Sequence, residues 1–157
     1  METKIPIEGA KVIKLKINKD ERGNFIELLR QDQKLMNGIE QISISTTNPG
    51  VIKAFHFHKN QTDIWYVVEG KAYVGLYDNR ENSKTKGEKF ELILENKEDE
   101  RVILVIPKGI AHGYKAVGDK PLTMLYMMDK CYNPSEPDEL RIPHDDPNIA
   151  FDWAKHD

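Results

Sequence analysis

Hydrophobic and polar residues alternate along much of the chain, which is typical of β-strands with one buried face. In the segment Lys11–Ile17, lysines separate the apolar residues Ile13, Leu15 and Ile17, and this period of two favours a strand over a helix. Similar short runs predict further strands at Asn24–Arg30, Ile39–Thr47, Val51–His58, Ile64–Glu69, Lys71–Asp78, Lys89–Leu94, Arg101–Pro107 and Leu122–Met128. A helical turn is indicated only at Gln31–Asn37.

The connections between these runs indicate an antiparallel fold. They are short and carry turn residues, as at Asn48-Pro49-Gly50, and none contains a helix of crossover length. The stretch from Asn133 to Asn148 is rich in proline, which is excluded from central strands, so we expect it to wrap the surface. With 157 residues, the chain has the size of one domain, and we expect residues 1–157 to form a single all-β sandwich or barrel.

Composition and charge exclude several classes of function. The chain is 39% hydrophobic and 31% charged, as in a folded soluble protein, and its net charge of −3 provides no basic stripe for nucleic acid. No apolar run is long enough to span a membrane, and the N-terminus lacks the apolar core of a signal peptide. Because Cys131 is the only cysteine, we expect a reducing, cytoplasmic location.

Two histidines lie on one face of the run that ends at residue 58. Side chains of a strand alternate between its faces, so His56 and His58 share one face while Phe55 and Phe57 share the other. If the histidines face a polar lumen, the two phenylalanines point outward and need cover from another sheet or subunit. We therefore expect a homodimer whose interface includes this outer face.

The spacing around these histidines resembles the two sequence motifs of the cupin superfamily. The first motif matches at Gly50, His56, His58, Asp63 and Gly70, with Asp63 in place of the usual Glu, and the second at Pro107–His112. The resemblance implies a cupin-type jelly-roll β-barrel with an extended C-terminal segment. In that superfamily, residues at the positions of His56, His58, Asp63 and His112 hold a divalent metal, and such nitrogen and oxygen ligands suit Fe, Mn, Ni or Zn.

Longer segments resemble one cupin family, the dTDP-4-dehydrorhamnose 3,5-epimerases, in family order. They are Asp20–Glu27, Gln41–Ser45, Gly50–His58, Ile106–Tyr114, Tyr126–Tyr132 and Asp145–Trp153. The resemblance implies an isomerase or epimerase that acts on a nucleotide-linked 4-keto-6-deoxy sugar, with dTDP as nucleotide, in polysaccharide or deoxysugar biosynthesis. Its reaction is proton abstraction next to the keto group, which requires no cofactor. His56 matches the family's catalytic base, and Tyr126 matches its catalytic acid.

The same resemblance implies a set of substrate contacts. Arg22 would address the diphosphate, Lys53 stands where the family has a second arginine, and Tyr132 would pack on the base or sugar. The full set of implied substrate-binding residues is Arg22, Phe25, Glu27, Gln41, Lys53, His112, Tyr132 and Glu139.

Three departures from the family pattern affect the predicted chemistry. Asp63 replaces a lysine that steadies the enolate, and His58 replaces a glutamine. The family also extends beyond the Asp-Trp ending, and that extension holds the aspartate that orients the catalytic histidine, so we expect this partner to be missing. Asp63 could restore a dyad with His56 or His58, or a divalent metal could polarise the keto oxygen.

Several interpretations therefore stay open. The leading one is a sugar-nucleotide isomerase in which His56 is the base, Tyr126 is the acid, and Asp63 or His58 supports His56. His56-Phe57-His58-Lys59 is also similar to a run in dTDP-sugar 3,4-ketoisomerases. The alternatives from other classes are a metal-dependent cupin enzyme that uses His56, His58, Asp63 and His112, and a sugar-nucleotide-binding protein without epimerase activity.

Overall fold

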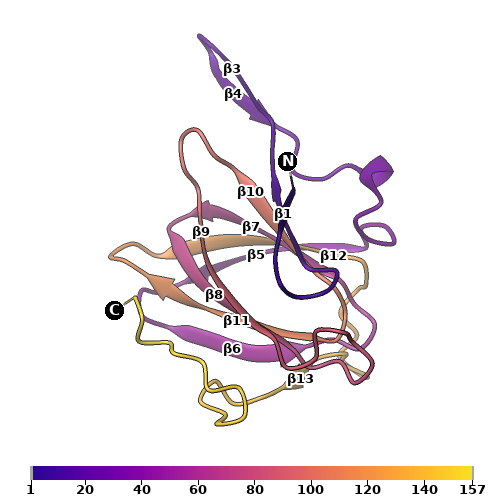
Figure 1. The fold of residues 1–157 in the computed structure, drawn as a ribbon. Helices are drawn as coiled ribbons and strands as arrows, with labels where there is room; N and C mark the ends of the chain where they lie inside the picture. The colour runs from indigo at the N-terminus through magenta and orange to yellow at the C-terminus, as the bar shows by residue number, and fades with distance from the viewer. Residues whose placement is uncertain (1, 157) are drawn as a thin grey trace.

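The computed structural model describes residues 2–156, whose regular structure is almost entirely β-strand (Figure 1). The strands are β1 (Glu2–Lys4), β2 (Lys11–Lys14), β3 (Ile17–Asp20), β4 (Gly23–Ile26), β5 (Gln41–Thr47), β6 (Ile52–Phe57), β7 (Asp63–Glu69), β8 (Lys71–Asp78), β9 (Lys89–Glu95), β10 (Val102–Ile106), β11 (Ile110–Val117), β12 (Leu122–Met128) and β13 (Leu140–Arg141). A 3-10 turn, η1 (Gln31–Gln33), lies within the predicted helical turn. Within residues 2–156, no helix is long and apolar enough to cross a membrane.

Two antiparallel sheets form the body of the protein. The larger has six strands in the order β1-β2-β10-β7-β12-β5, and the smaller has five in the order β13-β6-β11-β8-β9. The strands β3 and β4 pair only with each other, and their hairpin projects away from both sheets (Figure 1). This architecture confirms the predicted all-β jelly-roll class.

The main core lies between the two sheets. Trp65 and Leu104 come from the six-stranded sheet and meet Leu76 and Ile110 from the five-stranded sheet, and all four are inaccessible to solvent. Burying a large apolar side chain contributes about 1.5–3 kcal/mol, so this layer is the main source of stability for the barrel. The core fills one part of the lumen and leaves the other part to polar side chains.

The outer face of β6 is covered by the C-terminal segment of the same chain. Phe55 is only 1% exposed, and its ring centroid lies 5.7 Å from that of Phe151 and 5.3 Å from that of Trp153. Phe57 packs against the same cluster. The tail of the same chain therefore folds back and supplies the apolar cover that these phenylalanines need, and a homodimer interface on this face stays a prediction.

Several predicted strands differ in extent from the observed ones. The predicted strand Lys11–Ile17 is divided between β2 and β3, and Asn24–Arg30 is a strand only as far as Ile26. Strand β11 was not predicted, because every one of its residues is buried and its sequence shows no alternation. The proline-rich tail follows the surface as expected and adds the short edge strand β13 to β6.

Candidate functional site

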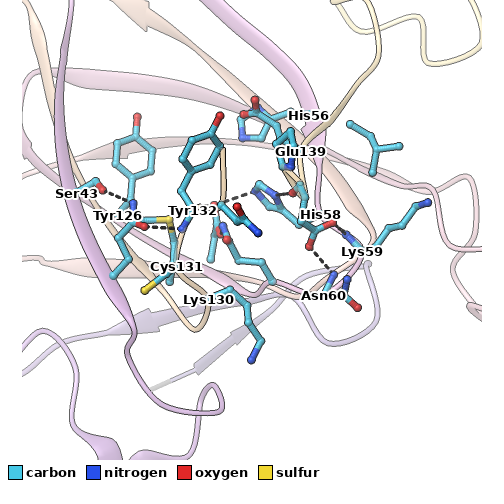
Figure 2. Close-up of a pocket in the computed structure, with 18 of the residues that line it drawn as sticks. Ser43, His56, His58, Lys59, Asn60, Tyr126, Lys130, Cys131, Tyr132 and Glu139 are labelled. Atoms are coloured by element: carbon cyan, nitrogen blue, oxygen red, sulfur yellow. Dashed lines mark hydrogen bonds and ion pairs between the residues drawn. The ribbon is translucent and has the colours of Figure 1, made fainter. Parts of the chain in front are cut away.

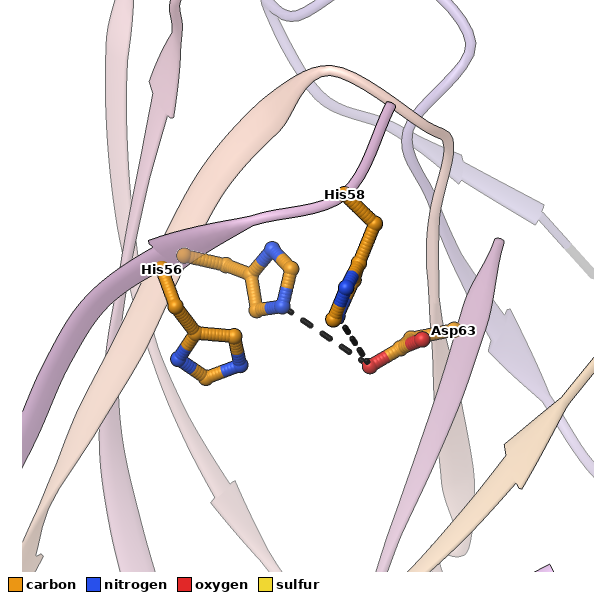
Figure 3. Close-up of side chains that lie close together, drawn as sticks. His56, His58 and Asp63 are labelled. Carbon is orange, nitrogen blue, oxygen red and sulfur yellow. Dashed lines mark ion pairs between the residues drawn. The ribbon is translucent and has the colours of Figure 1, made fainter. Parts of the chain in front are cut away.

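Four ligand-type side chains meet at the polar end of the lumen (Figure 3). His56 on β6 lies directly opposite His112 on β11, and their ring centroids are 4.3 Å apart. His58 follows the end of β6, and Asp63 is the first residue of β7. One donor atom from each of the four lies within 4.8 Å of the others. The structure thus brings together the cluster predicted from the sequence.

Backbone carbonyls orient two of the histidine rings. Nδ1 of His112 lies 2.7 Å from the carbonyl oxygen of Ile110, and Nδ1 of His58 hydrogen-bonds the carbonyl oxygen of Asp138. Because a carbonyl oxygen only accepts, both Nδ1 atoms carry a proton and donate it. Both rings therefore direct Nε2 towards Oδ2 of Asp63, at 3.6 Å from His58 and 3.7 Å from His112.

Asp63 is a buried carboxylate that keeps its charge. Burial acts to raise its pKa, but the close contact with His58, the charges of His112 and His58, and the Gln61 amide together lower it to about 2. Gln61 Nε2 donates to Oδ1 over 2.6 Å. Burial acts to lower the pKa of His58, but Asp63 reverses the effect and leaves it raised. His58 and Asp63 therefore form an ion pair when His58 is protonated.

The pKa of His56 shifts in the opposite direction to that of His58. Burial, followed by the charges of His112 and His58, lowers its pKa to about 3, although the carboxylates of Glu139 and Asp63 act to raise it. Its ring nitrogens make no hydrogen bond with any of residues 2–156, and Glu139 lies beside it in the cavity (Figure 2). At neutral pH His56 is therefore an uncharged imidazole with a lone pair available to accept a proton.

Tyr126 on β12 provides a protonated hydroxyl group in the same cavity. Its hydroxyl oxygen lies 2.8 Å from Oγ of Ser45 and 2.9 Å from the hydroxyl oxygen of Tyr114. Burial and the neighbouring Tyr114 raise the pKa of Tyr126 above its ordinary value. A phenol in this position stays protonated at neutral pH and can donate to an enolate.

These groups open into a cavity of about 740 Å³ (Figure 2). This volume suits a small-molecule ligand. The sequence-predicted residues that line it are Gln41, Lys53, His56, His58, Asp63, Tyr126, Tyr132 and Glu139. Lys59 and Lys130 add further positive charge to its wall. His112 lies deeper in the cluster and is only 1% exposed.

Three predicted substrate-binding residues lie outside this cavity. Arg22 and Phe25 belong to the projecting β3–β4 hairpin, where Phe25 is 65% exposed. Glu27 follows β4 and forms an ion pair with Arg30 over 3.2 Å. Within one chain, these three side chains do not contribute to the cavity that holds His56.

Sequence reasoning missed several polar residues of the site, which are Ser45, Gln61, Tyr114 and Asp138. Tyr114 could have been found, because it is two residues from His112 and would share its face if Ile110–Val117 were treated as a strand. Asp138 has no comparable local signal, since its place depends on how the tail returns to β6.

A jelly-roll barrel with a lumen cluster of three histidines and a carboxylate places the chain among the cupin-like proteins. The family model described as dTDP-4-dehydrorhamnose 3,5-epimerase matches residues 4–157. The chain belongs to this enzyme family.

Individual relatives cover nearly the whole chain. The spore coat polysaccharide biosynthesis protein SpsL of Bacillus subtilis (strain 168) is 50% identical over 147 residues, which are 94% of this chain and 96% of SpsL. The crystal structure of a dTDP sugar isomerase from Desulfovibrio desulfuricans G20 is 32% identical, with a TM-score of 0.85 over 97% of this chain and 95% of that one. A dTDP-6-deoxy-D-glucose-3,5-epimerase from Legionella pneumophila, solved with dTDP-4-keto-L-rhamnose, is 28% identical with a TM-score of 0.85, over 98% of this chain and 82% of its own.

Proposed function

We propose that the protein is a cytoplasmic isomerase or epimerase of a dTDP-linked 4-keto-6-deoxy sugar in polysaccharide or deoxysugar biosynthesis. The observation that carries the proposal is the juxtaposition of an uncharged His56 and a protonated Tyr126 in one cavity. Epimerisation next to a ketone requires a base to remove a proton and an acid to return one on the opposite face. Family membership over residues 4–157 supports the same chemistry.

The side chains divide the reaction between them. His56 removes the proton next to the keto group, because it is the histidine in the cluster whose ring nitrogens have no hydrogen bond. Tyr126 donates to the enolate. The His56 and His58 ring centroids are 5.6 Å apart. When His58 is protonated, it forms a charged pair with Asp63 beside His56, and its charge stabilises the enolate oxygen. No cofactor takes part in this scheme.

The cavity wall supplies the groups for the rest of the substrate. Lys53 provides positive charge for the diphosphate, Gln41 and Tyr132 contact the nucleotide, and Glu139 lies beside the sugar. The backbone N–H of Tyr132 donates to Oε1 of Gln41 over 2.7 Å, which fixes these two residues relative to each other.

Deuterium wash-in from D₂O into dTDP-4-keto-6-deoxyglucose tests this function. We expect exchange next to the keto carbon with the intact protein and a loss of at least about 10²-fold in His56→Ala, the lower end for general base catalysis. His144→Ala is the matched control, because His144 is exposed on the tail. Tight nucleotide binding with no exchange would contradict the proposal and favour a sugar-nucleotide-binding protein.

We further propose that the active form is a homodimer in which the β3–β4 hairpin reaches the cavity of the second copy. Arg22 and Phe25 lie on this hairpin outside the cavity of their own chain, and Phe25 is 65% exposed. The outer side of edge strand β5 is also apolar, with Ile42 at 59% and Ile44 at 64% exposure. An edge strand with an exposed apolar face is suited to self-association.

Complementation between two inactive variants tests the exchange of hairpins. Mixing Arg22→Ala with His56→Ala after subunit exchange should restore about a quarter of the wild-type activity, since half of the dimers are mixed and each holds one intact site. If the hairpin serves its own chain, the mixture should show no more activity than the two variants measured separately.

A second candidate function is that of a metal-dependent cupin enzyme, and one buried atom favours it. Nε2 of His112 has no hydrogen-bond partner among residues 2–156 and lies 3.7 Å from Oδ2 of Asp63. A lone pair and a carboxylate oxygen repel each other unless a proton or a cation lies between them. His56, His58, Asp63 and His112 would hold a divalent cation, which would polarise the keto oxygen as a Lewis acid.

Elemental analysis of protein purified without chelator distinguishes the two functions. A metal site predicts about one Fe, Mn, Ni or Zn per chain, lost in His112→Ala and retained in His144→Ala. Sub-stoichiometric metal together with indifference to added metal ions would reject the second candidate.

A further inference from the structure

One residue of the tail makes three contacts with the turn that carries His58. The carboxylate of Asp138 accepts the backbone N–H of Lys59 at Oδ1 and that of Asn60 at Oδ2, both over 2.8 Å. Its backbone carbonyl accepts a hydrogen bond from Nδ1 of His58. The position of the turn and the orientation of the histidine ring are therefore fixed by the same residue.

The carbonyl contact determines which nitrogen of His58 is protonated. A carbonyl oxygen cannot donate, so Nδ1 carries the proton and Nε2 is left for proton transfer or charge pairing. Nε2 is the atom that faces Asp63, at 3.6 Å from Oδ2. With the other tautomer, Nε2 would carry the proton of the neutral ring and the contact to Asp138 would be lost.

Asp63 does not perform this orienting role. Its distance of 3.6 Å to His58 is too long for a hydrogen bond, and its other oxygen is occupied by the Gln61 amide over 2.6 Å. The hydrogen bond that fixes the His58 ring is therefore the one to Asp138.

We propose that Asp138 is a positioning residue that sets the tautomer of His58 and so makes Nε2 the atom that handles charge and protons in the reaction. The part played by His58 in catalysis rests on the proposed function, whereas the tautomer is a property of the free protein.

Nitrogen-15 NMR of the histidine side chains in the free protein tests the tautomer directly. We expect the wild-type His58 ring, when neutral, to show a protonated Nδ1 and an unprotonated Nε2. In Asp138→Asn, one carboxylate oxygen becomes an amide nitrogen that cannot accept a backbone N–H, and in Asp138→Ala both acceptors are removed. Both variants keep the backbone carbonyl but release the turn that places His58 against it, so both should show a mixture of tautomers.

The kinetic result should follow the spectroscopic one. We expect kcat for exchange to fall about 10–100-fold in Asp138→Asn with little change in KM, the range typical for groups that orient a functional histidine. Asp145→Asn is the matched control, because Asp145 is an exposed residue of the same tail. It should match the wild type in both measurements.

Other outcomes would overturn the proposal. An Nε2-protonated neutral ring in the wild type would do so without any variant, even if the variants failed to fold. A higher KM with an unchanged tautomer would make Asp138 a substrate contact instead. Absence of exchange in the wild type would reject the proposed function, while the NMR result would still decide whether Asp138 sets the tautomer.

Discussion

The hydroxyl groups of Tyr126 and Tyr114 lie 2.9 Å apart at the boundary between the polar cluster and the apolar core. Tyr126 also contacts Ser45 over 2.8 Å, and Tyr114 contacts Thr47 over 3.0 Å, which gives a chain of four hydroxyl groups from β5, β12 and β11. Hydroxyl groups in such a chain polarise one another, and their positions are fixed by the strands that carry them. The chain holds the Tyr126 hydroxyl in place, while burial and the neighbouring Tyr114 keep it protonated.

Replacing Tyr126 with phenylalanine removes the proton donor and preserves the shape of the ring. Because His56 is retained, we expect deuterium exchange to continue while net inversion of configuration falls about 10²–10⁴-fold, the range for loss of a general acid. NMR of the product formed in D₂O separates the two quantities. Tyr114→Phe is the matched control and should have a smaller effect, and equal losses of exchange and inversion in Tyr126→Phe would contradict the assigned role.

Glu139 is predicted to set the basicity of His56. Its carboxylate acts to raise the pKa of His56, against burial and the charges of His112 and His58, which together lower that pKa to about 3. Removing the negative charge in Glu139→Gln should lower the pKa further. The acidic limb of the pH profile of kcat/KM should therefore move to lower pH, and the plateau rate should fall because the base is weaker.

Asp145→Asn provides the control for Glu139→Gln, since it removes one negative charge from the tail at an exposed position. It should leave the acidic limb in place. An unchanged limb in Glu139→Gln as well would show that Glu139 contacts the substrate without affecting the base.

The local sequence pattern predicts which side chains of β6 face the site, but it does not predict which segment covers the opposite face of this strand. The positions of His56 and His58 follow from strand alternation alone, so their shared face was predictable. The cover over Phe55 was not, because it comes from Phe151 and Trp153, nearly a hundred residues further along the chain. Alternation identifies an apolar face and gives no information about which segment packs on it.

The buried strand β11 and the projecting hairpin show two further limits. Strand β11 is buried on both faces, so the period of two that identifies half-buried strands is absent. Arg22 and Phe25 were identified by resemblance, but no local pattern shows that their hairpin leaves the body of the chain. These properties depend on packing between distant segments.

The tail that covers β6 should be important for stability. Trp153 is 6% exposed, packs against Phe55 and Phe151, and donates its Nε1–H to the His144 carbonyl over 2.9 Å. Trp153→Ala should lower the free energy of unfolding by about 3–5 kcal/mol, as is usual for a large buried aromatic side chain. Urea denaturation measures this change.

Tyr132→Ala is a suitable comparison, because the Tyr132 side chain is 62% exposed. Replacing an exposed side chain of this kind should change the free energy of unfolding by about 0.5 kcal/mol or less. Equal and small effects for Trp153→Ala and Tyr132→Ala would mean that the tail does not pack on β6 in solution.

A buried carboxylate outside the active site should make stability depend on pH. Asp78 accepts two hydrogen bonds from the Arg80 side chain, each over 2.8 Å, and hydroxyl hydrogen bonds from Ser83 and Thr85, each over 2.6 Å. Burial acts to raise its pKa, but these contacts reverse the effect and leave the pKa below the ordinary 3.8. The ionised form is therefore favoured in the folded state.

Because the pKa of Asp78 is lower in the folded state than in the unfolded state, its contribution is complete above about pH 5 and is lost as the pH falls below about 4. Asp78→Asn should lower the free energy of unfolding by about 1.5–3 kcal/mol at pH 7, the range for hydrogen bonds to a charged group. The difference between variant and wild type should shrink as the pH approaches 2, whereas Asp145→Asn should show no such trend. A difference that stays constant from pH 7 to pH 2 would mean that the Asp78 carboxylate does not titrate with folding.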